Sequence, residues 1–153
     1  MIKLLELLRI LGSCLGVFLA YWFGNTPEEV LRIMTPWLIG SIAGLSAIDG
    51  LLFADRAAAE KGYEAGSSYQ RQSALWFLAI TIVALASWSA GWDAYANIAL
   101  ASLFCLFLVL SAANHLYSMI AEGNTTWQNA IRPVLTALLT LAFAQPVSAI
   151  LLR

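Results

Sequence analysis

The chain has 153 residues, of which 61% are hydrophobic and 11% are charged, and its formal net charge is −1. A soluble domain is about 45–50% apolar and about 25% charged, so this composition excludes an ordinary soluble domain and intrinsic disorder. Two cysteines are too few for a disulfide scaffold, and the charge balance gives no reason to expect nucleic acid as a partner. We therefore expect an all-α membrane protein, a single transmembrane helical domain over residues 1–153.

Charge-free runs predict five membrane spans. Stretches without Asp, Glu, Lys or Arg cover residues 10–27, 33–48, 72–92, 94–121 and 133–152, and a spanning helix needs about 20 apolar residues. We place the spans at about 8–24, 33–54, 72–91, 94–120 and 132–152, with Asp49 tolerated inside the second. Glu6 and Arg9 shorten the apolar part of the first segment, so four spans with an interfacial first segment is the alternative.

Helix-start and turn signals separate these spans. Residues 25–29, Asn-Thr-Pro-Glu-Glu, combine a capping side chain, a proline and two acids, which is typical of a helix N-terminus. Thr35-Pro36 repeats the signal, so the second helix starts either there or at Pro27. Residues 55–71 read as a polar loop, while residues 91–93 form a connection short enough to make the third and fourth helices antiparallel neighbours.

The distribution of basic residues predicts the orientation. With five spans, one side of the membrane receives most of the Lys and Arg residues, namely Lys3, Arg9, Arg56, Lys61, Arg71 and Arg132. The other side receives only Arg32 and Arg153. Basic loops stay in the cytoplasm, so we expect a cytoplasmic N-terminus in a multi-pass protein of a prokaryotic cytoplasmic membrane.

Small residues predict where helices pack closely. Gly12, Gly16 and Gly24 recur with Ala20 at a spacing of four in the first helix, and Gly40 and Gly44 repeat that spacing in the second. Such stripes let backbones approach each other inside a membrane. They favour packing of the first helix on the second, with a dimerisation face as the alternative.

Polar residues inside the predicted spans mark the candidate site. Asp49 lies twelve residues beyond Trp37, about 18 Å along a helix and therefore within the hydrocarbon core. Ionisable groups are costly there and mark functional sites or ion pairs. The predicted topology gathers a polar pocket on the cytoplasmic side, made of Asp49, His115, Asn114, Arg71, Gln128 and Arg132. The alternative is structural, with Asp49 paired to Arg71 or Arg132 and the arginines reaching lipid phosphates.

The sequence carries no enzyme motif that assigns a reaction. Residues 44–47, Gly-Leu-Ser-Ala, lack the last glycine of the GxSG motif of rhomboid proteases, and no metal-binding or cofactor motif is present. Our leading hypothesis is a small transporter or channel component for an ion or small polar solute. The alternatives are a non-catalytic subunit of a larger membrane complex and, with least support, an enzyme acting on a lipid. We expect a homo-oligomer or a membrane-protein partner, and we expect neither a metal nor a cofactor.

Overall fold

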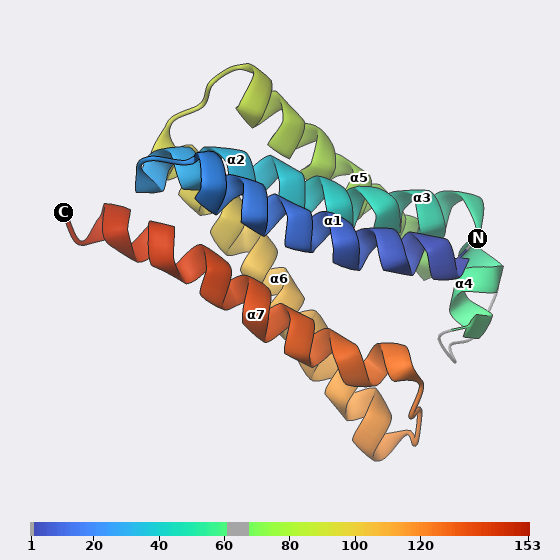
Figure 1. Ribbon diagram of the computed structural model, residues 1–153. Coiled ribbons are helices and arrows are strands. Elements are labelled where there is room, and N and C mark those ends of the chain that lie inside the picture. The colour runs from blue at the N-terminus through green and yellow to red at the C-terminus, as the bar shows by residue number, and fades with distance from the viewer. Residues whose placement is uncertain (1, 61–67) are drawn as a thin grey trace.

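The computed structural model describes residues 2–60 and 68–153, and this part of the chain is helical without strands. The helices follow one another back and forth, so that the two termini lie at opposite ends of the molecule (Figure 1). Lys61, one of the basic residues used to predict the orientation, lies outside the described residues. The elements in chain order are α1 (Ile2–Phe23), α2 (Pro27–Ile39), η1 (Gly40–Gly44), α3 (Leu45–Leu52), α4 (Ala54–Glu60), α5 (Ser68–Ser89), α6 (Ala94–Ala121) and α7 (Trp127–Leu151).

Five helical segments are long and apolar enough to cross a membrane, which confirms the number of candidate spans. They are α1, the continuous segment α2–η1–α3, α5, α6 and α7. The first candidate span covers Lys3–Phe23, so it includes Glu6 and Arg9 and begins earlier than predicted. Charge-free runs mark where apolar sequence ends, whereas a helix continues through polar residues that form helices well.

Several helix boundaries differ from the predicted spans. Of the two predicted starts of the second helix, the structure has Pro27, where the Thr26 hydroxyl caps the Glu29 amide, and the helix continues through Pro36. The predicted loop 55–71 contains α4, because the three consecutive alanines at 57–59 favour a helix. Helices α5 and α7 start at Ser68 and Trp127, several residues before the predicted spans.

Helix α2 is the centre of the bundle. It packs against α1, α5, α6 and α7, and most of its apolar side chains are buried, with Trp37 as the exposed exception. One core cluster joins Leu31, Met34 and Leu38 of α2 to Ile98 of α6 and Phe143 of α7. In Figure 1, α1 runs alongside α2 and α3, whereas the α6–α7 pair diverges from them toward its own connecting loop.

A π-helical turn in the second span orients the Asp49 side chain toward α1. In a regular α-helix of about 100° per residue, the twelve residues from Trp37 to Asp49 would place the two side chains roughly 120° apart. The π-helical turn Gly40–Gly44 inserts one extra residue and removes about 100° of that difference. Trp37 and Asp49 therefore both contact α1, at Gly12 and Arg9 respectively.

The glycines of the first helical segment pack against the second span of the same chain. The indole Nε1 of Trp37 donates to the Gly12 carbonyl at 2.7 Å, and a Cβ on Gly12 would meet Ser41 Oγ at 2.7 Å. A Cβ on Gly16 would overlap the Trp37 ring, and one on Gly24, just after α1, would meet Val30 in the first turn of α2. The glycines of the second span differ, because Gly44 faces Thr81 of α5 and Gly40 faces open space. The close packing of α1 on α2 thus needs Gly12 and Gly16 but not Gly40.

A tyrosine of α1 satisfies a backbone carbonyl that a proline leaves without its helical donor. Pro146 lies within α7 and has no N–H for the carbonyl of Ala142, four residues earlier. The Tyr21 hydroxyl donates to that carbonyl at 2.9 Å. This bond ties α1 to α7 near the end of the bundle where α1 finishes.

We predict that Gly16→Ala destabilises the packing of α1 on α2, whereas Gly40→Ala does not. The added methyl at residue 16 would overlap the rigid Trp37 ring, and overpacking of this kind costs roughly 1–3 kcal/mol. At residue 40 the methyl meets nothing within 4 Å. Thermal unfolding followed by circular dichroism in detergent measures both, and equal melting temperatures for the two variants would contradict the packing described.

Candidate functional site

Asp49 is paired with Arg9 of α1, a residue outside the predicted pocket. The Arg9 guanidinium Nη2 donates to Asp49 Oδ2 at 2.9 Å and to the Leu45 carbonyl at 3.2 Å. Asp49 is 2% exposed, so this ion pair is removed from solvent. The sequence instead offered Arg71 or Arg132 as the structural partner of Asp49 and did not name Arg9.

Arg9 also links Asp49 to a second acid. Its Nη1 lies 2.8 Å from Glu6 Oε1, one turn earlier on α1. The same Glu6 oxygen lies 3.4 Å from Arg132 Nη2 on α7. Glu6 and Arg9 are each 8% exposed. The pair therefore lies within the bundle, although sequence reasoning treated it as the limit of the first span.

Arg132 continues the chain of contacts to the histidine. Its Nη1 lies 2.8 Å from His115 Nε2, and His115 Nδ1 lies 2.8 Å from Asn129 Oδ1. A guanidinium can only donate, so Nε2 accepts and the ring proton is on Nδ1, which donates to Asn129. The Asn129 amide nitrogen donates in turn to the Asn124 carbonyl at 2.9 Å. These bonds define a neutral His115 of fixed orientation.

The six side chains form one continuous network across four elements. We refer to Asp49, Arg9, Glu6, Arg132, His115 and Asn129 as the polar network. Two guanidinium groups balance two carboxylates while the histidine is neutral, so the network carries no net charge. Such compensation is what allows charges to remain away from water.

Arg132 is the link between the two parts of the network. Asp49, Arg9 and Glu6 come from α3 and α1, whereas His115 and Asn129 come from α6 and α7. Arg132 contacts a member of each part, and its side chain is 25% exposed, more than that of Glu6 at 10%. This long side chain reaches α1 from the α6–α7 pair, which diverges from α1 at this end (Figure 1).

The remaining predicted residues lie outside the network. Asn114 is exposed on α6 beside His115, and Arg71 is exposed in the first turns of α5. Gln128 is buried at 5% exposure, and its Oε1 has no hydrogen-bond partner among the described residues. The structure therefore brings together Asp49, His115 and Arg132 from the predicted set, in a packed network instead of a pocket.

Sequence reasoning missed Glu6, Arg9 and Asn129 as site residues. Glu6 and Arg9 have a spacing of three, which places them on one face of a helix, and they carry opposite charges. This pairing was the available signal that both could lie inside a membrane-spanning helix. No group of three or more His, Cys, Asp or Glu side chains that could hold a metal ion occurs among the described residues.

We predict that Asp49→Asn and Arg9→Gln each destabilise the protein by about 3 kcal/mol, because either removes one charge from a buried ion pair. The pair should couple, so that the double variant loses less than the sum of the single losses. Reversible unfolding in mixed detergent micelles measures the four members of this cycle. A coupling energy near zero would show that the two side chains do not interact.

Comparison with known proteins places the chain in a family without assigning an activity. No curated protein and no solved structure matches the chain. The matching family model covers residues 4–152 and so includes every member of the polar network. The chain belongs to this family, which is DUF6790, a family of unknown function.

Proposed function

We propose that this protein is a small multi-pass membrane protein whose activity is proton-coupled transport of a small ion or polar solute. The five candidate spans support insertion, because each can cross a hydrocarbon core about 30 Å thick. In the proposed topology the N-terminus is cytoplasmic, and the polar network lies in the cytoplasmic half of a prokaryotic cytoplasmic membrane.

One observation carries the proposal: the same arginine joins two titratable groups from different parts of the bundle. Arg132 contacts His115 Nε2 at 2.8 Å with one nitrogen and Glu6 at 3.4 Å with the other. Buried carboxylates and histidines in membrane helices are costly and are typical of proton-coupled pumps and transporters.

Protonation of His115 is incompatible with the contacts of the network. It would place a second N–H at Nε2, facing the N–H of Arg132, and a second positive charge beside the guanidinium. Two like charges about 4 Å apart repel by roughly 4 kcal/mol at an effective dielectric constant of about 20. The groups that compensate within the network are Glu6 and Asp49, and Arg9 occupies both of them.

We therefore expect a proton on His115 to displace Arg132 from the ring and to weaken its contact with Glu6. Because that contact joins the α6–α7 pair to α1, the two parts of the bundle would separate further at this end. A proton bound at one residue would then change the access of a solute to the space between helices. Since an arginine stays protonated, we propose binding of one proton coupled to a conformational change instead of proton hopping along the network.

The experiment is proton movement into liposomes that contain the purified protein and a pH-sensitive dye. Outward gradients of K⁺, Na⁺ or Cl⁻ are imposed in turn, and we expect one of them to drive proton flux. His115→Gln and Arg132→Gln should lower that flux at least about tenfold, the size of effect expected for loss of a positioned proton-transfer group.

The matched control is Glu28→Gln, which removes an exposed ion pair with Arg153 at the opposite end of the bundle. This variant should transport like the wild type. A wild-type protein that moves protons under none of the three gradients would contradict coupling to these ions, and an unchanged flux in His115→Gln would contradict the role of the network.

A second candidate is a non-catalytic subunit of a larger membrane complex, favoured by the charge neutrality of the network. In such a subunit the neutral network would have a purely structural role, which is to hold α1, α3, α6 and α7 in register. Extraction in a mild detergent distinguishes the two candidates. Co-purification of a stoichiometric partner, together with absence of flux from the isolated chain, would favour the subunit.

A further inference from the structure

An apolar groove runs along the outside of the bundle, between the second span and α5. Its volume is about 520 Å³, and its lining is almost entirely carbon. Small residues form one side and α5 forms the other: Gly40, Gly44 and Ala47 face Leu78, Thr81 and Leu85. The one hydroxyl among these six, that of Thr81, already donates to the Phe77 carbonyl at 2.8 Å. The groove therefore offers no hydrogen bond to a polar ligand along this stretch.

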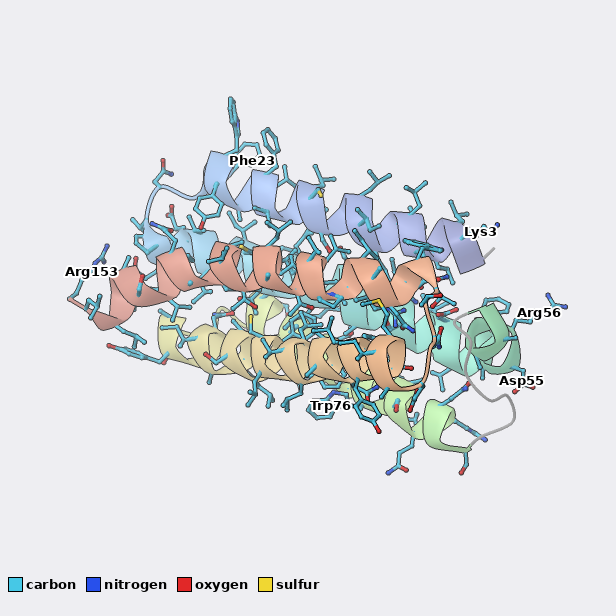
Figure 2. The ribbon with its side chains drawn as sticks, turned by 90° about the horizontal axis from the view of Figure 1, so that it is seen from below. Lys3, Phe23, Asp55, Arg56, Trp76 and Arg153 are labelled. Atoms are coloured by element: carbon cyan, nitrogen blue, oxygen red, sulfur yellow. The ribbon has the colours of Figure 1, made fainter. Side chains whose placement is uncertain are left out.

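The groove ends at a charged mouth. Leu51 and Leu52 line both this groove and a second hollow that continues to Asp55 and Arg56. Asp55 and Arg56 lie at the same end of the molecule as Lys3 (Figure 2). Arg71 belongs to this end as well, because the neighbouring Gln70 carbonyl and Ala74 lie against Gly50 of α3. Arg56, Arg71 and Asp55 are all exposed. Two guanidinium groups and one carboxylate are thus exposed here, and Glu60 at the end of α4 is a second acid of this segment.

The length of the groove matches one leaflet of a bilayer. From Gly40 to Leu52 the helix rises about 18 Å, at about 1.5 Å for each of twelve residues. Half of a hydrocarbon core of about 30 Å is about 15 Å. A transmembrane helix of a second copy would need a contact along the full core, whereas one acyl chain reaches only to the midplane.

We propose that this groove binds an anionic glycerophospholipid, with one acyl chain between η1–α3 and α5 and the headgroup phosphate at Arg56 and Arg71. The apolar walls exclude water from the chain, and the exposed guanidinium groups of Arg56 and Arg71 attract the phosphate. The proposal rests on the membrane insertion proposed above and is independent of proton coupling at the polar network.

Gly40 provides the direct test of the acyl chain. A Cβ at this position meets nothing within 4 Å, and Gly40 lines the groove, so we expect Gly40→Leu to occupy the groove and not the helix contacts. The matched control is Ala137→Leu, which adds the same group at an exposed position of α7 away from the groove. Circular dichroism melting of both variants in detergent verifies that each is folded.

Native mass spectrometry with added phosphatidylglycerol or phosphatidylcholine of equal chain length measures the binding. We expect one phosphatidylglycerol per wild-type chain and at least about tenfold weaker binding to Gly40→Leu, because displacement of two to three methylenes has that effect. Ala137→Leu should bind like the wild type. Equal binding by the two leucine variants would overturn the acyl-chain site, as would a dimer that assembles in place of lipid and is lost in Gly40→Leu.

The arginines test the headgroup separately. In the double variant Arg56→Gln, Arg71→Gln we expect phosphatidylglycerol to lose its preference over phosphatidylcholine by about fivefold or more. Arg32→Gln, an exposed basic residue near the other end of the second span, is the matched control and should keep the preference. A preference that survives in the double variant would overturn the headgroup assignment. If the wild-type protein moves protons but binds no lipid, this inference fails and the proposed function stands. If it binds lipid but moves no protons, the proposed function fails and this inference stands.

Discussion

The arrangement at one end of this bundle depends on the guanidinium of Arg132. It extends from α7, accepts no hydrogen bond itself, and contacts His115 at 2.8 Å and Glu6 at 3.4 Å. Through Glu6 and Arg9 the same network reaches Asp49, which is 2% exposed. At the other end, the Tyr21 hydroxyl on the Ala142 carbonyl holds α1 to α7. One end is thus held by a hydrogen bond from a neutral hydroxyl and the other by contacts of a charged guanidinium.

The second span determines how the network forms. Its core residues hold α6 and α7 on one side and α5 on the other. Its π-helical turn, next to Gly40, brings Asp49 onto the face that Trp37 already occupies against α1. The same turn leaves Gly40 facing open space, where the apolar groove begins. The network and the groove are therefore two consequences of one irregular segment.

The number of candidate spans followed from the sequence, because long apolar runs have a direct physical meaning. The partner of Asp49 did not follow, because it depends on the π-helical turn and on α1 lying closer than any local pattern specifies. Glu6 and Arg9 were interpreted as the end of a span, since a hydropathy rule treats every charge as a cost and does not see that two opposite charges compensate. His115 and Arg132 were placed in one candidate site correctly, but their direct contact needs the α6–α7 pairing, in which the Asn124 carbonyl positions Asn129.

In the proposed mechanism, a proton on His115 releases Arg132 and lets the α6–α7 pair separate from α1. The most direct measurement is the distance between spin labels at Leu4→Cys on α1 and Ala130→Cys on α7, with Cys14 and Cys105 replaced by serine. Both labelled positions are exposed near the polar network. We expect the distribution of distances between the two labels to shift to longer values on acidification, and we expect no such shift in His115→Gln. Identical distributions at neutral and acidic pH would contradict the proposed mechanism.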